Sequence, residues 1–309
     1  MPIRQTGRGK RRGRRVVVIA LVAIVLGVVA WKVLTPSPPP EIEAWLATAT
    51  QEVQDDQREM DEHRGRGTGV FERIQAWASQ GKQQDNDALA LAHLAARDGR
   101  IDVLEWLKGQ GEDIDAREYR GQTPMFYAAN EGHVEVMAWL KDQGADVDAT
   151  DGRGCTPMVG PASVGHVEVM VWLKDQGADI NAKDNDGRTP MFIAAERGRL
   201  DAMMWLKEHG ADANAQDNNG MTVLFFAVLS DDVEAMQWVK DQGADVNAAR
   251  NNGRTPMFYA AQYACLNAMA WLKEQGADLN ATSNDGQTPL SFTDSEDAKQ
   301  WLRDHGAQE

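Results

Sequence analysis

The residues of this chain that could do chemistry are few, and their spacing fits none of the common reactions. Residues 184–187, Asp-Asn-Asp-Gly, resemble the start of a calcium-binding loop. However, the position two residues earlier is Ala182, and the position that needs a bidentate glutamate is Ile193. The ligand set of such a loop is therefore incomplete. We interpret the stretch as a turn.

The six histidines form no catalytic or metal-binding motif. His133 and His166 are 33 residues apart, which predicts equivalent places in two repeated units, and the other histidines are scattered. Nucleophilic catalysis needs a base beside the nucleophile, and a metal site needs several ligands at defined spacing. The sequence therefore predicts a protein that is not an enzyme and that holds no cofactor and no metal.

The elements that must position these residues follow one period of 33 residues. Self-similarity at such a spacing indicates stacked repeats, each too small to bury its apolar face alone. Tryptophan recurs at 106, 139, 172, 205, 238 and 271, glycine at 111, 144, 177, 210, 243 and 276, and threonine at 123, 156, 189, 222, 255 and 288. One elongated array is therefore expected in place of a single large core.

The unit at 121–149 indicates what one repeat contains. Thr123 can cap a helix start, and Pro124 at the first helical position has a preset φ and loses no needed N–H. A first helix of about two turns is predicted there. Residues 133–143 place apolar side chains three and four apart, which predicts a second helix that ends at Gly144. An extended segment then leads into the next turn.

The repeated pattern G-x-T-P-M-F-x-A-A-x-x-G-H-V-E-V-M-x-W-L-K-x-x-G-A-D-V-D/N-A closely resembles the ankyrin repeat. The resemblance covers about residues 87–309. It implies an all-α ankyrin-repeat solenoid of 33-residue helix-turn-helix units with hairpin loops. Six repeats are expected in residues 87–284. A shortened C-terminal repeat or cap is expected in residues 285–309, because Trp301 follows Trp271 by 30 residues.

Apolar positions within the repeats predict how the core is packed. The family usually has a histidine after T-P-L, and this chain has an apolar residue there in five units, which argues against the usual turn-bracing hydrogen bond and predicts more apolar packing. The replacing residues are Phe126, Val159, Phe192, Phe225 and Phe258. The tryptophans lie between apolar neighbours, so stacking should place the indoles in one buried column. The methionines at 125, 158, 191 and 257 are expected to fill the core.

The N-terminal composition predicts a membrane anchor in front of this solenoid. Residues 16–34 form a 19-residue apolar run interrupted only by Lys32, which is close to the length that crosses a bilayer core of ~30 Å. Positive charges precede the run and acidic residues follow it, so the positive-inside rule keeps the N-terminus in the cytoplasm. We predict a basic cytoplasmic segment at 1–15 and a single-pass transmembrane signal anchor at 16–34.

A removable signal peptide is the alternative, with cleavage near Ala30. We prefer the retained anchor because the apolar run continues past Ala30 for almost a full span. Both interpretations export the repeats. Residues 35–40 are a Pro-rich linker, and residues 41–86 are expected to form an N-terminal helical cap. The compact export signal favours a bacterial inner membrane with periplasmic repeats, and a eukaryotic type II membrane protein is the other interpretation.

The charge balance limits the class of partner. Residues 1–40 contain eight basic residues and no acidic one, which leaves 24 basic and 47 acidic residues in the remainder, a net charge of −23. Contacts to phosphates need clustered Lys and Arg. We therefore exclude nucleic acid as a partner of the repeats and expect a protein, for which the acidic array favours a basic one.

The two cysteines would matter in an oxidising compartment. Cys155 and Cys265 fall three units apart, so their sulfurs should be on the order of 30 Å from each other, far beyond the reach of a disulfide. No intramolecular disulfide is expected. Cys155 lies at a turn tip and is expected to be the more exposed thiol, which could pair with another chain.

Partner binding, if the ankyrin resemblance holds, should use the hairpin tips and the first helices, which line the concave face. Arginine and tyrosine are typical interface anchors, and both occur in these tips. A purely solvated role for these polar turns is the alternative. The candidate residues are Tyr119, Arg120, Gln122, Arg153, Cys155, Asn185, Asp186, Arg188, Asn218, Asn219, Met221, Asn251, Asn252 and Arg254, with Asn130, Glu131, Glu196, Arg197, Gln262 and Tyr263 behind them.

Three positions break the repeated pattern. Pro161 falls inside the first helix of its unit, where proline removes a helical hydrogen bond and should shorten or kink the helix. Asp231 and Ala264 replace the glycine of the turn between the two helices, where a left-handed conformation costs alanine on the order of 1 kcal/mol. Either drift or a tailored binding surface could explain these departures.

Together these features predict a non-enzymatic protein-protein interaction scaffold, anchored in a membrane, that binds an envelope or secreted protein. One alternative is a regulator or inhibitor of a specific extracytoplasmic enzyme. The other is an envelope structural element that assembles with itself. The sequence leaves the oligomeric state open.

Overall fold

The computed structural model describes residues 40–42, 44–45, 48, 84–109 and 111–308. The predicted basic segment and membrane anchor, and most of the predicted linker and N-terminal cap, lie outside these residues and stay predictions. Within the described part of the chain, no helix is both long enough and apolar enough to cross a membrane. The chain divides into two compact units, and each is described by itself.

The first unit contains two consecutive helices, α4 (Gln84–Arg97) and α5 (Ile101–Gly109). The apolar face of α5 is buried through Val103, Leu104 and Leu107. Ile42 and Trp45 come from the region predicted as an N-terminal cap, and they are only 2% and 8% exposed. The few described residues of that region therefore contribute to an apolar interior.

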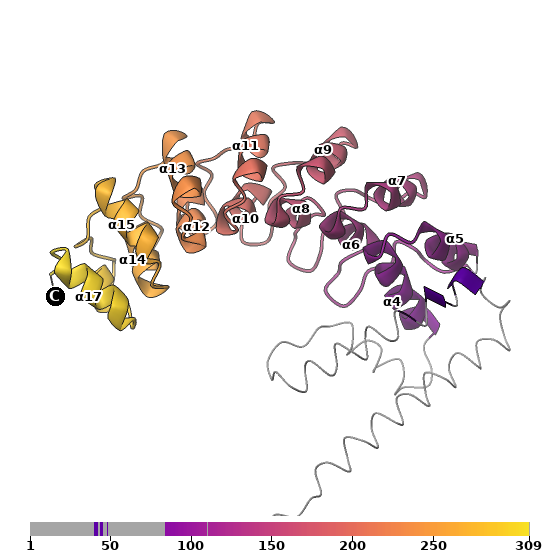
Figure 1. Ribbon diagram of the computed structural model, residues 1–309, viewed down its shortest axis with the longest axis horizontal. Helices are drawn as coiled ribbons and strands as arrows, with labels where there is room; N and C mark the ends of the chain where they lie inside the picture. The colour runs from indigo at the N-terminus through magenta and orange to yellow at the C-terminus, as the bar shows by residue number, and fades with distance from the viewer. Residues whose placement is uncertain (1–39, 43, 46–47, 49–83, 110, 309) are drawn as a thin grey trace, which may run out of the picture. The chain divides into compact units, whose positions relative to one another are not determined.

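The second unit is built mainly from residues 119–308 and consists of helix pairs arranged along an arc (Figure 1). In the pairs from α6 and α7 to α14 and α15, the first helix lies on the inner side of the arc and the second on the outer side. The first helices of neighbouring pairs pack against each other. The pairs are α6 (Pro124–Glu131) with α7 (Val134–Asp142), α8 (Val159–Val164) with α9 (Val167–Asp175), α10 (Pro190–Glu196) with α11 (Leu200–Glu208), α12 (Val223–Ser230) with α13 (Val233–Asp241), α14 (Pro256–Gln262) with α15 (Leu266–Glu274), and α16 (Pro289–Phe292) with α17 (Glu296–Asp304).

The predicted all-α solenoid is confirmed in this unit. Among the described residues the one isolated β-bridge joins Gln216 to Thr222, on the two sides of a turn. Because the main helix contacts join helices of one pair or of neighbouring pairs, the described residues of this unit form no central core, and its stability depends on the surfaces that successive pairs bury together.

The Thr-Pro pairs begin first helices where the sequence predicts, but by a different mechanism. Thr123 is extended, with φ −97°, and Pro124 is the first residue of α6. The hydroxyl of Thr123 makes no capping hydrogen bond, and the same holds for Thr189, Thr222 and Thr255. Where a Pro follows the threonine, its preset φ therefore favours the helix start.

The last helix pair is the exception in two ways. Its first helix, α16, is only four residues long. Here the Thr288 hydroxyl does cap the helix: it accepts a hydrogen bond from the backbone N–H of Ser291 at 3.3 Å, and the Ser291 hydroxyl binds back to the Thr288 N–H. A reciprocal capping box therefore stabilises the shortest helix.

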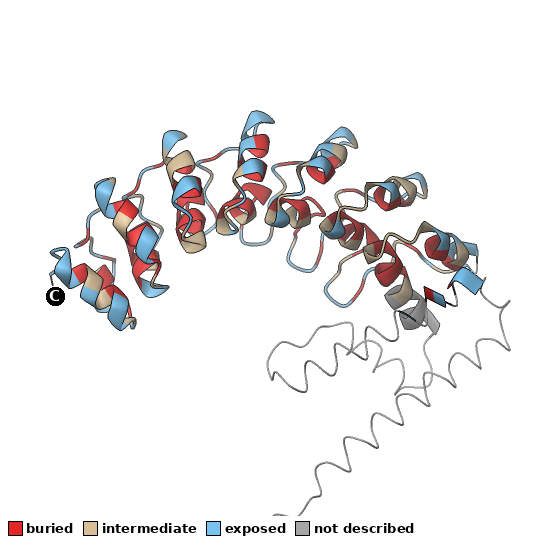
Figure 2. Ribbon diagram, in the orientation of Figure 1, coloured by how far each residue is buried: buried red, intermediate tan, exposed pale blue. Residues whose placement is uncertain are grey.

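The core lies between the inner and outer helices (Figure 2). The repeated methionines of the first helices have no exposed surface, as predicted for core filler, and the methionines of the outer helices are buried as fully. These fully buried residues are Met125, Met158, Met191, Met257, Met137, Met170, Met203, Met236 and Met269. Burial of each such side chain stabilises the fold by roughly 1.5–3 kcal/mol.

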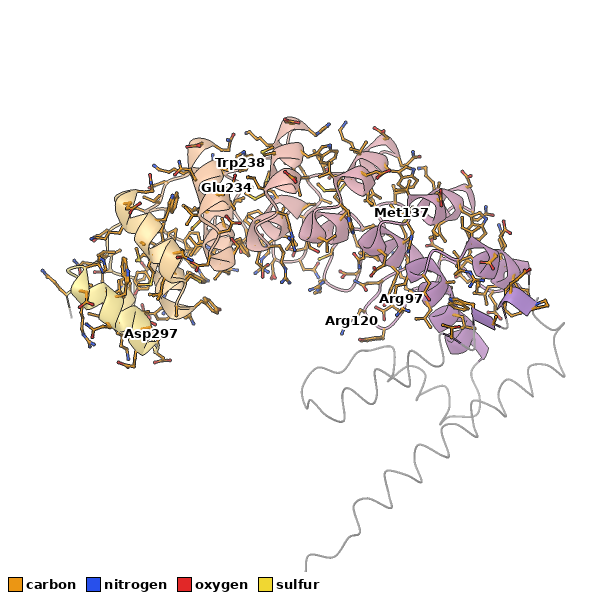
Figure 3. The ribbon with its side chains drawn as sticks, in the orientation of Figure 1. Arg97, Arg120, Met137, Glu234, Trp238 and Asp297 are labelled. Carbon is orange, nitrogen blue, oxygen red and sulfur yellow. The ribbon has the colours of Figure 1, made fainter. Side chains whose placement is uncertain are left out.

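The buried tryptophan column expected from the sequence is largely wrong. Trp205 and Trp271 are 9% and 4% exposed, but Trp139, Trp172 and Trp238 are only half-buried. Trp238, labelled in Figure 3, lies on α13 in the outer row of helices. The larger fully buried side chains of the outer helices are Val, Met and Leu instead, such as Val136, Met137 and Leu140 of α7.

An aromatic ladder runs instead through the inner helices. The ring of Phe192 packs edge-on against Phe226 of the next pair, with centroids 5.1 Å apart. Phe225 packs in the same way on Tyr259 at 5.4 Å, and Phe258 contacts Phe292 at 5.8 Å. The phenylalanines that replace the usual histidine therefore form apolar contacts between neighbouring repeats, as the sequence predicts.

Candidate functional site

The turns that precede the first helices form a row along the inner side of the second unit. We call these turns the tips; they comprise residues 119–122, 151–155, 184–188, 217–221, 250–254 and 283–287. Figure 3 shows Arg120, from the first tip, on the inner side of the arc, whereas Glu234 lies on the outer row of helices. The tips and the inner helices beside them are therefore the surface on which to look for a site.

Hydrogen bonds join each tip to the next. The backbone N–H of Asn218 donates to the carbonyl of Asp186 at 2.8 Å, and the Asn218 Nδ2 donates to the carbonyl of Asn185 at 3.0 Å. The same two bonds are made by Asn185, Asn251 and Asn284, each to the tip before it. This ladder fixes the spacing of the tips before any partner arrives, which lowers the ordering cost of binding.

The ladder depends on a glycine in each tip. Gly187 has φ +83°, in the left-handed region, and a Cβ added to it would lie 2.4 Å from the Asn218 Oδ1. A side chain at position 187 would therefore strain the backbone and also displace the asparagine that bridges the tips.

An aspartate braces three of the tips. The Asp184 Oδ1 accepts hydrogen bonds from the backbone N–H groups of Asp186 and Arg188, at 2.9 and 2.8 Å. Asp151 and Asp217 make the equivalent pair of bonds in their own tips. Such local bonds from an aspartate to the main chain hold a turn in one conformation.

Arginine side chains lie over aromatic rings beside the tips. The guanidinium carbon of Arg188 is 5.1 Å from the centre of the Phe226 ring, and that of Arg254 is 3.9 Å from the centre of the Phe292 ring. Each arginine thus reaches from its own tip to the first helix of the next pair. The contacts join neighbouring repeats and present cationic groups on the inner surface.

The structure places the sequence-predicted residues at three depths. Exposed residues are Tyr119, Arg120, Arg153, Asn185, Asp186, Asn218, Asn219 and Asn251; half-buried residues are Gln122, Arg188, Asn252 and Arg254; buried residues are Cys155 and Met221. Behind them, Glu131, Arg197, Gln262 and Tyr263 are exposed, and Asn130 and Glu196 are half-buried. The binding role of the accessible residues stays a prediction, and the exposed asparagines of the ladder have a structural role as well.

Cys155 and Met221 correct the sequence interpretation. Both were predicted to present their side chains to a partner, and each is only 6% exposed. In both tips the aspartate draws the backbone N–H of this residue toward its carboxylate, at 2.9 Å, and the side chain packs inward. Burial and the negative charge of Asp151 raise the pKa of the Cys155 thiol to about 11. Cys155 is therefore not the exposed reactive thiol that its turn position suggested.

The sequence analysis did not single out Arg250 and Tyr259, two residues that contact each other on this surface. Arg250 occupies the position at which Asp151, Asp184 and Asp217 brace the earlier tips, and its Nη1 donates a hydrogen bond to the hydroxyl of Tyr259. The signal was present, because the 33-residue period shows an arginine where aspartate is expected. It was not recognised because the role of the aspartate appears only in the folded tip.

Pro161 has the effect predicted for it. Helix α6 begins at Pro124, which is equivalent to Pro157 in the next repeat. Helix α8 begins two residues later, at Val159, and is only six residues long. The adjacent Gly160 lies under Asn130 of the preceding pair; a Cβ on Gly160 would come within 1.6 Å of the Asn130 Oδ1. The Gly160-Pro161 irregularity therefore lies where two neighbouring repeats pack closely.

No group of three or more metal-ligating side chains occurs among the described residues. Asp184 is engaged by backbone N–H groups of its own turn, in agreement with the interpretation of residues 184–187 as a turn. The His133 Nε2 lies 2.8 Å from the carbonyl oxygen of Arg97, which is a structural contact. The chemistry that this surface offers is hydrogen bonding, cation–carboxylate pairing and aromatic contact.

Comparison with known proteins agrees with this architecture. A family model described as ankyrin repeats (3 copies) matches residues 92–184, 161–250 and 233–308. The crystal structure of the ankyrin repeat domain of Bcl-3, a member of the IkappaB protein family, is similar with a TM-score of 0.51 and 25% sequence identity, covering 69% of this chain and 97% of that chain. The eye-specific diacylglycerol kinase of Drosophila melanogaster is 27% identical over 103 residues, 30% of this chain and only 7% of the kinase.

Proposed function

We propose that this chain, which belongs to the ankyrin-repeat family, is a non-enzymatic protein-protein interaction scaffold that captures an envelope or secreted protein with its tips and inner helices. The observation that carries the proposal is the hydrogen-bonded ladder of tips. Asn185, Asn218, Asn251 and Asn284 each bind the preceding tip through main chain and side chain. A rigid row of accessible groups loses little conformational entropy when a partner binds.

Two exposed tyrosines support a binding role for this face. Tyr119, in the first tip, is 62% exposed, and Tyr263, at the end of α14, is 60% exposed. Large aromatic side chains are unfavourable in water and are enriched among residues that dominate binding energy. A partner that spans several repeats would cover both rings.

We also propose that residues 16–34 anchor the protein in a bacterial inner membrane, with the repeats on the periplasmic side. The proposal is supported by the apolar run, by the basic residues before it and by the acidic residues after it. The net charge of −23 after residue 40 would steer a basic partner toward the array.

Photo-crosslinking in the native membrane tests the capture proposal. A photoreactive phenylalanine analogue at position 263 should form a covalent adduct with a distinct protein, which mass spectrometry identifies. The matched control places the same group at position 204, because Met204 is 40% exposed but belongs to the outer helix α11. Adducts of equal yield from positions 263 and 204 would contradict partner capture on the inner face.

The anchor proposal has its own test. A protease added outside spheroplasts should digest the repeats, whereas a tag at the N-terminus should stay protected. Deletion of residues 16–34 should release the protein from the membrane fraction. Repeats that are protected from external protease would contradict the periplasmic location without affecting the capture proposal.

A further inference from the structure

The tip at 250–254 differs in charge from the other tips between residues 151 and 287. It carries Arg250 and Arg254 and no acidic residue, whereas the tips at 151–155, 184–188 and 217–221 each contain at least one aspartate. It lies in an array that is acidic overall. This tip therefore carries two cations and no anion of its own, which the overall charge does not predict.

Arg250 replaces a residue that stabilises the fold. In the earlier tips the aspartate at this position accepts two backbone N–H bonds, and an arginine side chain has no acceptor with which to do so. The tip retains only a weaker substitute, a 3.3 Å bond from the Arg254 N–H to the Asn252 Oδ1. In the last tip Ser283 keeps one acceptor, because its hydroxyl receives the Gln287 N–H at 3.1 Å.

The loss of the brace is informative because local rules of stability are most often broken at functional sites. A serine at position 250 would have kept part of the brace, as Ser283 does in the next tip. Arginine keeps none of it and introduces a charge. The substitution is therefore better explained by what the guanidinium binds than by the stability of the tip.

The guanidinium of Arg250 is held in place by an aromatic residue. Its Nη1 donates to the Tyr259 hydroxyl, and its carbon lies 5.9 Å from the centre of the Tyr259 ring. Tyr259 is in turn fixed by edge-on packing against Phe225. The arginine is thus oriented before a ligand arrives, which reduces the entropy lost on binding.

Three other arginines of the tips already have carboxylate partners, and the first of them, Arg153, lies 3.6 Å from Asp151. Arg188 pairs with Asp217 at 3.7 Å, and Arg254 pairs with Asp285 at 3.2 Å. Within residues 84–109 and 111–308, no carboxylate lies at ion-pair distance from Arg250. The Nε atoms of Arg188, Arg250 and Arg254 are all buried without a hydrogen-bond partner there, so the arginines differ in their ion pairs and not at Nε. Arg250 is therefore an oriented cation whose charge is not compensated by an ion pair.

We propose that Arg250 binds a carboxylate side chain, aspartate or glutamate, from an extended segment of the partner protein. Tyr263, one helical turn after Tyr259 and 60% exposed, supplies an aromatic surface for the residue beside that carboxylate. The inference rests on the proposed function and concerns one contact within the interface. A partner that is basic as a whole can present a single acid here, since long-range charge steers approach and paired groups determine register.

Selection from a library of random 12-residue peptides tests this contact. The full-length protein in detergent micelles serves as the target, and binders are eluted by competition with a peptide selected in a previous round. Binders should carry Asp or Glu at one shared position. Replacement of that acid by Gln or Asn should weaken binding to the wild-type protein by about tenfold, the loss expected for one charge pair at a half-exposed site.

Arg250→Asp is the central variant because it restores the residue that braces the earlier tips. It should fold at least as well as the wild type, with an equal or higher midpoint of thermal unfolding, and bind the selected peptides at least tenfold more weakly. Arg250→Gln provides a second variant without charge reversal, and Arg250→Lys should retain part of the affinity. Lys183→Asp makes the same change of charge at an exposed loop residue and should alter affinity by less than about threefold.

The possible results separate this inference from the proposed function. Binders that compete with each other on the wild-type protein but share no acid, or that bind Arg250→Gln and Arg250→Asp as tightly as the wild type, overturn the carboxylate contact and leave partner capture standing. A library that yields no binder overturns the contact at this site, whereas capture is then judged by the crosslinks from position 263. Equal loss of affinity in Lys183→Asp shows general electrostatics and also overturns the proposal.

Discussion

The carboxylate of Asp231 caps the outer helix of the next repeat at Ala268. Its Oδ1 accepts a hydrogen bond from the backbone N–H of Ala268 at 2.7 Å, and its Oδ2 accepts one from the Asn267 side chain at 3.0 Å. Asp231 itself is left-handed, with φ 54°, in the turn that usually contains glycine. The departure from glycine therefore has a structural explanation, since a carboxylate at a helix N-terminus satisfies a free amide and favours the helix dipole.

Asp231→Gly should lower the free energy of unfolding by about 1 kcal/mol, although glycine suits the backbone better. The charge-assisted hydrogen bond that is lost contributes ~1.5–3 kcal/mol. Removing the backbone strain of an aspartate in the left-handed region stabilises the protein by ~1 kcal/mol at most. Urea denaturation followed by circular dichroism measures the change. A variant more stable than the wild type would show that the cap contributes little.

Ala264→Gly should have the opposite effect and raise the free energy of unfolding by about 1 kcal/mol. Ala264 has φ 54° in the equivalent turn, and its methyl group cannot accept a hydrogen bond as the Asp231 carboxylate does. Ala261→Gly, inside helix α14 and fully buried, is the matched control and should be destabilising. Equal destabilisation by both substitutions would contradict the strain at position 264.

Thr255→Val should leave stability unchanged or raise it by about 1 kcal/mol. The Thr255 hydroxyl is buried and has no hydrogen-bond partner among the described residues, so the isosteric methyl group removes the cost of burying it. Thr288→Val is the control, because the Thr288 hydroxyl caps α16. Its loss should cost about 1 kcal/mol. The prediction fails if thermal unfolding shows both substitutions to be equally harmful.

Much of the helical solenoid was predictable because its signals are local. Pro124 presets the start of α6, and glycine at 132 ends it with φ 85°, so both ends of this helix are encoded within ten residues. The same signals recur with the 33-residue period and give the order of the helices. The period also predicts which residues share a face, and the repeated methionines and phenylalanines are buried as expected.

The burial of individual tryptophans and the contacts of the candidate site could not be predicted without the folded structure. Equivalent tryptophans differ in exposure because their neighbours differ: the Trp271 indole N–H donates to Gln237 of the adjacent helix, and Trp205 stacks on His209. The residue types at the positions of Gln237 and His209 differ from repeat to repeat, so the 33-residue period alone does not give these contacts. Arg250 could be recognised only as a departure from aspartate, since the repeated spacing contains no information on which N–H groups that aspartate binds.

Asp148 provides a prediction with a defined pH dependence. Burial raises the pKa of its carboxyl above the usual 3.8, and the nearby carboxylates of Asp146 and Asp179 raise it further, against a backbone hydrogen bond from Asp179 that lowers it. The ionised form is therefore disfavoured in the folded protein. The resulting loss of stability is absent below the unfolded pKa of 3.8, grows between that pH and the folded pKa, and is fully present above the folded pKa.

Asp148→Asn should consequently be more stable than the wild type at pH 7, with a smaller difference at pH 4. Asparagine occupies the equivalent position in the later repeats, where the Asn247 Oδ1 accepts the Asp278 N–H at 2.9 Å, so the bond between neighbouring loops is kept. Urea denaturation at the two pH values measures the difference. Asp142→Asn, at an exposed residue near the end of α7, controls for the change of net charge. An advantage that is independent of pH would contradict the assigned cause.

Cys155 should react slowly in the native protein and fast once the protein is unfolded. Its thiol is 6% exposed, and its pKa of about 11 leaves roughly one thiolate in a thousand at pH 8. Iodoacetamide labelling followed by peptide mass spectrometry gives the rate, and labelling in urea gives the reference. Because the thiol is buried beneath its tip, non-reducing electrophoresis should show the same bands for the wild type and for Cys155→Ser. A native dimer that disappears in Cys155→Ser would mean that this tip opens in solution, and the rigid ladder on which the proposed function depends would then have to be abandoned at that repeat.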